Sequence, residues 1–202
     1  MKRALLGLSL ALAFAGTAAR GATVVSGPIV NPANNHTYYL LSADTWTNSE
    51  AFAQTLGGHL VTINDAAENT FVYQNFAQGR NVWIGYNDQQ TEGTFVWASG
   101  ENPLYTNWRP GQPDNFSTSP VNGEDYVHMY GSQVVVNQVN LGGLWNDSAN
   151  DTSVYSSFSF ANEVGQIQGV VEVVPLPPAA YAGAALLGGM AILRARRRKL
   201  PA

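Results

Sequence analysis

The sequence of 202 residues contains no cysteine and carries little positive charge in its central part. Without disulfides, the fold must be held by its packed core, even in an oxidising compartment. Of the ten Lys and Arg residues, three lie in residues 1–20 and five in residues 194–199. Between them, Arg80 and Arg109 stand against fourteen acidic residues, a net charge of −12. This charge disfavours a nucleic-acid partner, because phosphate binding requires a basic surface, and it favours cations.

The sequence also lacks an apolar run of full transmembrane length, and its two apolar runs lie near the ends. Lys2 and Arg3 precede an apolar run over residues 4–15, and small residues continue to Ala22. This order is typical of a secretory signal peptide. We therefore expect residues 1–22 to direct export, with an uncleaved N-terminal anchor as the alternative.

The C-terminal segment, residues 175–202, has three parts in a fixed order. Prolines at 175, 177 and 178 are followed by an apolar run over 179–193 and a basic cluster. A fifteen-residue helix would reach only about 23 Å, whereas the hydrocarbon core of a bilayer is about 30 Å thick. A permanent membrane anchor would thus be under-length, and a transient membrane contact is the alternative.

This order of prolines, apolar run and basic cluster resembles the PEP-CTERM type of bacterial sorting signal, in its Val-Pro-Leu-Pro variant. The resemblance implies processing by an exosortase-type protease and display at the surface of a Gram-negative bacterium. The acidic residue that usually stands between the prolines is absent here.

The rest of the chain, about 150 residues, has the size of one domain. We expect an N-terminal lead over 23–35 and a domain over 36–174. Two helical patterns are predicted. The first begins at Thr47, which forms a capping-box pattern with Glu50, and the second begins at Asp65, with Glu68 three residues later. Strand-like segments are predicted at 37–41, 59–63, 82–85, 94–97, 126–130, 134–136 and 169–173. Two helices, several short strands and a long loop over 98–123 predict an α+β domain with a mostly antiparallel sheet. The Ser/Asn-rich stretch 148–166 reads as an exposed insertion.

Oxygen-bearing side chains are concentrated in and after this long loop, at Gln112-Pro113-Asp114, Glu124-Asp125 and Trp145-Asn146-Asp147. Calcium takes six to eight oxygen ligands from carboxylates, amides, backbone carbonyls and water. Histidine and cysteine are absent from these motifs, which argues against zinc. The motifs therefore predict a calcium site, with ordinary polar loop residues as the alternative.

Six motifs occur in an order that resembles the C-type lectin domain, from about residue 36 to residue 174. They are Gly57–Ile63, Trp83-Ile84-Gly85, Asn107-Trp108, Gln112-Pro113-Asp114, Gly123-Glu124-Asp125 and Trp145-Asn146-Asp147. The resemblance implies an α+β fold of two helices, small antiparallel sheets and a long calcium-binding loop. The family's two usual disulfides are missing, and the matching positions are Ala53 with Val171, and Tyr126 with Asn150. Without the second disulfide, we expect the loop to depend on calcium for its order.

The resemblance also implies site residues. The principal calcium ligands would be Gln112, Asp114, Glu124, Asn146 and Asp147. A second calcium would use Asp88, Glu92, Asn115 and Asp125, for which ordinary surface charge is the alternative. A sugar would contact Gln112, Asp114, Phe116, Glu124 and Asn146. In this family the peptide bond before the loop proline is cis, so we predict a cis Gln112–Pro113 bond when calcium is bound.

The order of amide before acid, Gln112 before Asp114, resembles that of lectins that prefer galactose and N-acetylgalactosamine. Phe116 stands where such lectins have an aromatic residue that stacks on the sugar, although inward packing is the alternative. We therefore expect a calcium-dependent binding protein for galactose-type glycans or exopolysaccharide. A lectin-like domain that binds a protein or a surface, with calcium only structural, is the second hypothesis.

Catalytic residues are not expected. The sequence shows no Ser/His/Asp or Cys/His arrangement, and a carboxylate bound to calcium is a poor general acid. His59 and His128 lie in strand-like segments and are expected to be structural. The sequence thus favours a binding protein over an enzyme.

Overall fold

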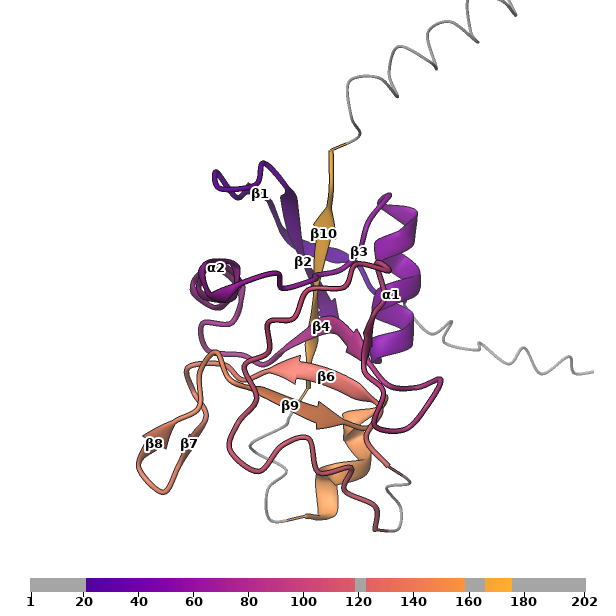
Figure 1. Ribbon diagram of the computed structural model, residues 1–202, viewed down its shortest axis with the longest axis vertical. Helices are drawn as coiled ribbons and strands as arrows, with labels where there is room; N and C mark the ends of the chain where they lie inside the picture. The colour runs from indigo at the N-terminus through magenta and orange to yellow at the C-terminus, as the bar shows by residue number, and fades with distance from the viewer. Residues whose placement is uncertain (1–20, 119–122, 159–165, 176–202) are drawn as a thin grey trace, which may run out of the picture.

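The computed structural model describes residues 21–118, 123–158 and 166–175, which form a two-helix α+β domain (Figure 1). The helices are α1 (Trp46–Thr55), α2 (Ala66–Phe76) and the short 3₁₀ helix η1 (Thr152–Ser157). The strands are β1 (Val24–Val30), β2 (Thr37–Ala43), β3 (His59–Leu60), β4 (Val82–Asn87), β5 (Val96–Trp97), β6 (Tyr126–Met129), β7 (Val135–Val136), β8 (Val139–Asn140), β9 (Trp145–Ser148) and β10 (Gln168–Val173). The predicted α+β class is confirmed.

The main sheet runs in the order β1-β2-β10-β4-β6-β9, with β3 added beside β10 and β5 beside β4. Its pairs are antiparallel except that β10 runs parallel to β4, where Gln168 faces Val82. Strands β7 and β8 form a separate hairpin. Helices α1 and α2 lie on either side of the β2–β10 pair (Figure 1). The strand that ends the described chain thus lies in the middle of the sheet.

Helix α1 begins earlier than the sequence predicts. Its N-cap is Thr45, whose hydroxyl accepts the Asn48 amide at 3.2 Å. Glu50 does not complete the predicted capping box, because its carboxylate accepts the Leu60 amide at 2.8 Å and contacts His59 at 2.7 Å. The glutamate therefore joins α1 to β3, and His59 is structural as expected.

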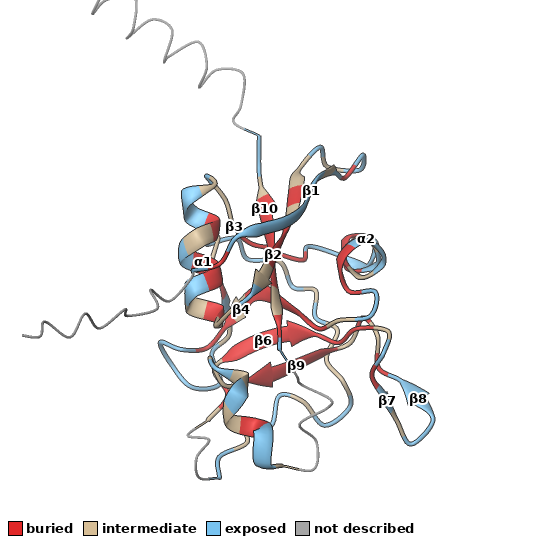
Figure 2. Ribbon diagram, turned by 180° about the vertical axis from the view of Figure 1, so that it is seen from behind, coloured by how far each residue is buried: buried red, intermediate tan, exposed pale blue. Residues whose placement is uncertain are grey.

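Helix α2 begins where the sequence predicts. Asp65 is the N-cap, and its carboxylate accepts the Glu68 amide at 2.8 Å. Val72 and Phe76 of the predicted stripe are buried in the main core beside Ile84 and Trp145, and Phe71 packs at its margin. Burial of such side chains is the main stabilising contribution in a domain without disulfides. Every residue of β6 and of β9 is buried, although β9 lies at the end of the sheet order (Figure 2).

The sequence analysis placed no strand before Thr37, whereas Val24–Val30 form β1 and pair with β2. It also treated residues 148–166 as an exposed insertion. Instead, β9 extends to Ser148 and η1 buries Tyr155, of which 1% is exposed. Residues 159–165 lie outside the described chain.

The positions that match the missing disulfides are filled in two ways. Ala53 and Val171 are both fully buried in one apolar cluster with Leu41. Tyr126 and Asn150 instead find separate partners at the start of α1. Tyr126 packs on Trp46 at 4.9 Å between ring centroids, and Asn150 hydrogen-bonds to Thr47 through both ends of its amide.

Within the described residues, no helix has the length and apolarity that crossing a membrane requires. The predicted signal peptide lies almost wholly outside them, as does the predicted sorting segment beyond Pro175.

Candidate metal centre

The long loop meets strand β9 at the start of the candidate site. Trp108 forms an isolated bridge with Trp145, and backbone bonds of 2.8 and 2.9 Å join Asn107 and Arg109 to Trp145. The indole of Trp145 donates to Asn69 of α2 at 2.8 Å, which fixes the entry into β9. The loop residues after Trp108 are therefore held beside the strand that carries Asn146 and Asp147.

Three carboxylates converge at this place, from Asp114, Glu124 and Asp147, with ligating oxygens within 4.8 Å of one another. Asp147 also accepts the backbone amides of Asp114 at 3.3 Å and Asn115 at 2.8 Å. The Gln112–Pro113 bond is cis, which is the form predicted for the calcium-bound site. The structure thus brings loop and strand carboxylates from distant parts of the sequence into one group.

Two amide oxygens beside this group have no hydrogen-bond partner. The side-chain oxygens Gln112 Oε1 and Asn146 Oδ1 are buried, and neither accepts a hydrogen bond. A buried polar atom without a partner costs about 1–3 kcal/mol, so its presence requires an explanation. Three carboxylates and two orphaned carbonyl oxygens are a set of hard oxygen donors that fits calcium. These are the five residues that the sequence proposes as principal ligands.

Glu124 and Asp147 of this group resist ionisation. The pKa of Glu124 is raised to about 8, mainly by burial and also by the nearby Asp147, although the hydrogen bond from Tyr155 opposes the shift. Burial likewise raises the pKa of Asp147 to about 6. A cation would favour the ionised forms of both groups.

Tyr155 of η1 is a site residue that the sequence analysis missed. Its hydroxyl donates to Glu124 Oε1 and accepts the Ala149 amide at 2.8 Å. The second oxygen of Glu124 accepts the Phe116 amide at 3.0 Å. In the sequence, Tyr155 is an isolated tyrosine in a Ser/Asn-rich stretch, and no periodic pattern indicates its role.

Phe116 is half-buried and packs edge-on against Phe158, with ring centroids 5.5 Å apart. This contact corresponds to the inward-packing alternative for its side chain. The phenylalanine therefore connects the loop to the segment that follows η1.

The residues proposed for a second calcium lie next to the first group. Asp88 is buried, with Oδ1 lacking a partner and Oδ2 accepting the Gly93 amide at 2.8 Å. Its charge contributes to raising the pKa of Glu92 and of Asp125, after the effect of burial. Asn115 differs from the expectation, because its Oδ1 accepts the Glu124 amide at 2.9 Å. Asp88 is thus near enough to Glu92 and Asp125 to affect their pKa, and Asn115 makes a bond within the loop.

A second group of potential ligands lies away from the long loop, where β2 and β10 meet α2. His36, Glu68 and Glu172 have ligating atoms within 4.8 Å of one another. His36 Nδ1 lies 2.5 Å from Glu172 Oε1, and the Tyr38 hydroxyl lies 2.5 Å from Glu68 and 3.0 Å from Glu172. The remaining carboxylate oxygens accept the amides of Asn64 at 2.8 Å and Thr62 at 3.0 Å. Sequence analysis did not predict this group.

Comparison with known proteins gives a family match over the central part of the chain. The family model described as the Lectin C-type domain matches residues 42–154. The low affinity immunoglobulin epsilon Fc receptor of Mus musculus is 34% identical over 111 residues, which are 55% of this chain and 29% of that protein. C-type mannose receptor 2 of Homo sapiens is 31% identical over 141 residues, which are 69% of this chain and 9% of that protein. The match therefore covers less than a third of either relative's own length.

Solved structures agree on the fold. The carbohydrate-recognition domain of cow CD23, crystallised in the presence of a GlcNAc2Man3 oligosaccharide, has a TM-score of 0.53 and 26% identity, covering 70% of this chain and 90% of that one. A calcium-independent type II antifreeze protein has a TM-score of 0.52 and 19% identity, covering 77% and 93% of the two chains. The second likeness concerns the fold alone.

Proposed function

The chain belongs to the C-type lectin domain family, and from this premise we propose that it binds carbohydrate in a calcium-dependent manner at a bacterial cell surface. Members of this family are generally carbohydrate-binding proteins and not enzymes. The single observation that carries the proposal is the group of Asp114, Glu124 and Asp147 beside two orphaned amide oxygens.

We assign five residues to the principal calcium: Gln112, Asp114, Glu124, Asn146 and Asp147. When bound, the ion would supply open coordination positions that sugar hydroxyls can fill. Asp147 also holds the loop through two backbone amides, and Tyr155 orients Glu124. The proposed sugar contacts are Gln112, Asp114, Glu124 and Asn146, with Phe116 at the margin.

A galactose-type preference is the finer part of the proposal. It rests on the order of Gln112 before Asp114, which sets the donors and acceptors that sugar hydroxyls meet. The packing of Phe116 against Phe158 supports a limited role for its ring in sugar stacking. Specificity would therefore come mainly from the polar groups around the metal.

We propose that a second calcium uses Asp88, Glu92 and Asp125. The partnerless Oδ1 of the buried Asp88 supports this assignment. Asn115 would contribute less than the sequence suggested, because its oxygen already accepts the Glu124 amide.

The ends of the chain suggest how the domain reaches its place of action. We propose that residues 1–22 direct export and that residues 175–202 act as the sorting signal, processed by an exosortase-type protease. Galactose-type glycans or exopolysaccharide at the cell surface would then be the partner. Pulse-labelling of the native chain and of a chain truncated after Val174 would test this, with surface retention expected only for the former.

Isothermal titration with methyl galactoside and methyl mannoside, in calcium and in chelator, tests the sugar proposal. We expect galactoside binding in calcium, none at this site in chelator, and loss of binding in Asp147→Asn. Glu101→Gln, which removes one exposed carboxylate of the same loop, is the matched control. Absence of sugar binding in saturating calcium would falsify the proposal.

The second candidate function keeps the fold and binds a protein or an inorganic surface, with calcium only structural. The packing of Phe116 on Phe158 favours keeping this candidate, because it turns the expected sugar-stacking ring inward. Asp114→Asn and Phe116→Ala would then leave partner binding intact, whereas both lie within the proposed sugar contacts.

A further inference from the structure

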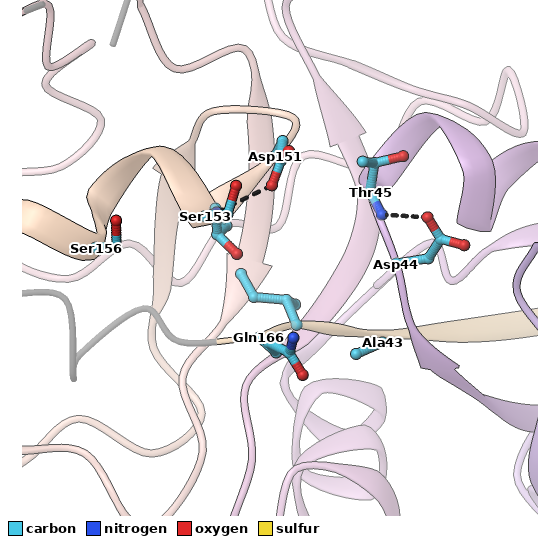
Figure 3. A pocket seen from close by; sticks show the side chains of 9 residues that line it. Ala43, Asp44, Thr45, Asp151, Ser153, Ser156 and Gln166 are labelled. Carbon is cyan, nitrogen blue, oxygen red and sulfur yellow. Dashed lines mark hydrogen bonds between the residues drawn. The ribbon is translucent and has the colours of Figure 1, made fainter. Parts of the chain in front are cut away.

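A pocket of about 510 Å³ lies between η1, the junction of β2 with α1, and the start of β10 (Figure 3). Asp151 and Ser153 lie on one side of it, and Asp44 and Thr45 lie on the other (Figure 3). Its volume is within the range of about 300–1,000 Å³ that is typical of small-molecule sites. The pocket shares no residue with the proposed metal and sugar sites.

Helix η1 separates this pocket from the calcium site. Ser153 and Ser156 line the pocket and are three residues apart, which places them on one face of a 3₁₀ helix. Tyr155 is buried and contacts Glu124 of the metal group. Different side chains of η1 therefore contribute to the pocket and to the metal group.

Two hydroxyls and one amide of the pocket, on Ser153, Ser156 and Gln166, are available to a ligand. Within the described residues, no hydrogen bond engages the side chain of Ser153, Ser156 or Gln166. A hydroxyl can both donate and accept, and the amide of Gln166 offers two donors and one acceptor oxygen. The pocket thus presents groups that can follow the alternating donors and acceptors of a polyol.

The charge of the pocket limits what it can bind. Asp44 uses Oδ1 to accept Thr45 N and Asn48 Nδ2, each at 2.8 Å, and Asp151 uses Oδ1 to accept Ser153 N at 2.9 Å. The second oxygen of each carboxylate remains as an acceptor. No Lys, Arg or His is among the described residues that line the pocket. An anionic ligand would meet two carboxylates and no cation, so the ligand must carry donors and no negative charge.

We propose that this pocket binds a neutral polyhydroxylated ligand, a saccharide unit, without calcium. Sugar hydroxyls would donate to Asp44 and Asp151 and exchange hydrogen bonds with Ser153 and Ser156. Ile167 of the lining is buried, so the apolar surface offered to a sugar ring is the methyl group of the exposed Ala43. This site goes beyond the calcium-dependent function and does not require it.

The test uses the whole exported chain in excess EDTA, so that the calcium site does not contribute. Lactose and maltose are added in turn, and backbone amide shifts are recorded by NMR. We expect saturable shifts at Ala43–Thr45 and Asp151–Ser156, with dissociation constants near about 1 mM. Shifts at Gln112–Asn115 should appear only in the parallel titration with calcium and galactoside.

Two variants of η1 provide a matched pair. Ser156→Phe fills the pocket, whereas Ser157→Phe adds the same ring to the next residue, which is exposed and does not line it. In EDTA we expect Ser156→Phe to weaken disaccharide binding at least about tenfold and Ser157→Phe to leave it unchanged. Gln166→Ala, which requires no added volume, should weaken binding several-fold if Ser156→Phe proves unstable.

Three outcomes overturn the proposal: no disaccharide shifts in EDTA, shifts elsewhere only, or equal affinity in wild type and both pocket variants. Putrescine, a short dication, tests whether the pocket binds a cation instead of a saccharide. Binding of putrescine without binding of either disaccharide would reassign the pocket to cations. Calcium-dependent galactoside binding is measured separately, so failure here and failure of the principal site are distinguishable.

Discussion

Two groups of ligating side chains in this domain each contain two buried carboxylates and differ in whether neighbouring polar atoms lack a partner. In the group of His36, Glu68 and Glu172, each carboxylate oxygen accepts at least one internal hydrogen bond, and an imidazole is among the donors. In the loop group around Asp147, the donors to the buried carboxylates are backbone amides and a phenol, and two neighbouring amide oxygens accept nothing.

The difference shows what distinguishes a structural network from a metal site. Clustering of carboxylates is common to both groups, so it does not decide the question. Internal donors compensate the first group, as buried charges require. In the second group, the oxygens of Glu124 and Asp147 also accept internal hydrogen bonds. The amide oxygens of Gln112 and Asn146 accept none, and a divalent cation would provide their partner.

The largest effect should come from breaking the satisfied group. Glu172→Ala would leave His36 and the Thr62 amide without their acceptor, and we expect a loss of about 3–5 kcal/mol in unfolding free energy. Urea unfolding in calcium and in chelator should give the same loss. A loss confined to the calcium sample would remove the distinction between the two groups.

Calcium should stabilise the domain through the loop group. At about one hundred times the dissociation constant, we expect about 2.7 kcal/mol, or a rise in Tm of roughly 5–10 °C. Asp147→Asn should abolish this rise, and Glu101→Gln should retain it. Thermal unfolding monitored by circular dichroism measures each value. An unchanged calcium response in Asp147→Asn would contradict the assignment.

His128 is a third case for comparison with the two groups, because it is a buried base with neither a proposed metal nor a carboxylate partner. Burial lowers its pKa to about 3, and its Nδ1 contacts Ser148 Oγ at 3.0 Å. The unfolded chain binds this proton near pH 6.5 and the folded domain does not, so stability falls as pH drops below 6.5. Between pH 6.5 and pH 5, we expect His128 to lower the free energy of unfolding by about 2 kcal/mol. His128→Gln should show a shallower pH dependence in urea unfolding, and identical slopes would refute this origin.

The smallest effect is expected at the margin of the loop group. Phe116→Ala should weaken sugar binding by less than about 1 kcal/mol, or up to about fivefold, because the ring packs on Phe158. Calcium affinity should remain unchanged. Calorimetry with galactoside and with calcium separates the two effects. A loss of sugar affinity well above tenfold would instead place the ring on the sugar.

Much of the fold could be predicted because its signals are local. Asp65 caps α2 as predicted, since a carboxylate three residues before a free amide needs no tertiary information. The cap of α1 was misplaced because Glu50, an apparent capping partner, binds β3 instead. Strand β1 was missed because its turn and bulge residues, including a cis Gly27–Pro28 bond, interrupt the strand pattern.

The residues of the candidate site were predicted from the order of the motifs. Other residues that matter for the site and the fold were not predicted. All five proposed ligands lie in recognisable motifs, and the structure groups the three carboxylates among them, Asp114, Glu124 and Asp147. Tyr155 and the group around Glu172 depend on contacts between distant segments. A sequence pattern has no periodic signal for such contacts, so only the folded chain reveals them.

The first turn of α2 places two adjacent residues in different networks. Glu68 belongs to the satisfied group, and Asn69 accepts from Trp145 at the start of β9. This helical turn thus connects the hydrogen-bonded group around Glu172 to β9, the strand that carries Asn146 and Asp147. The strand side of the proposed metal site is therefore held by contacts that need no ion, and the loop side is joined to it through the two backbone amides that Asp147 accepts. A site that is prepared in this way would lose less conformational entropy on binding a ligand, even in a domain without disulfides.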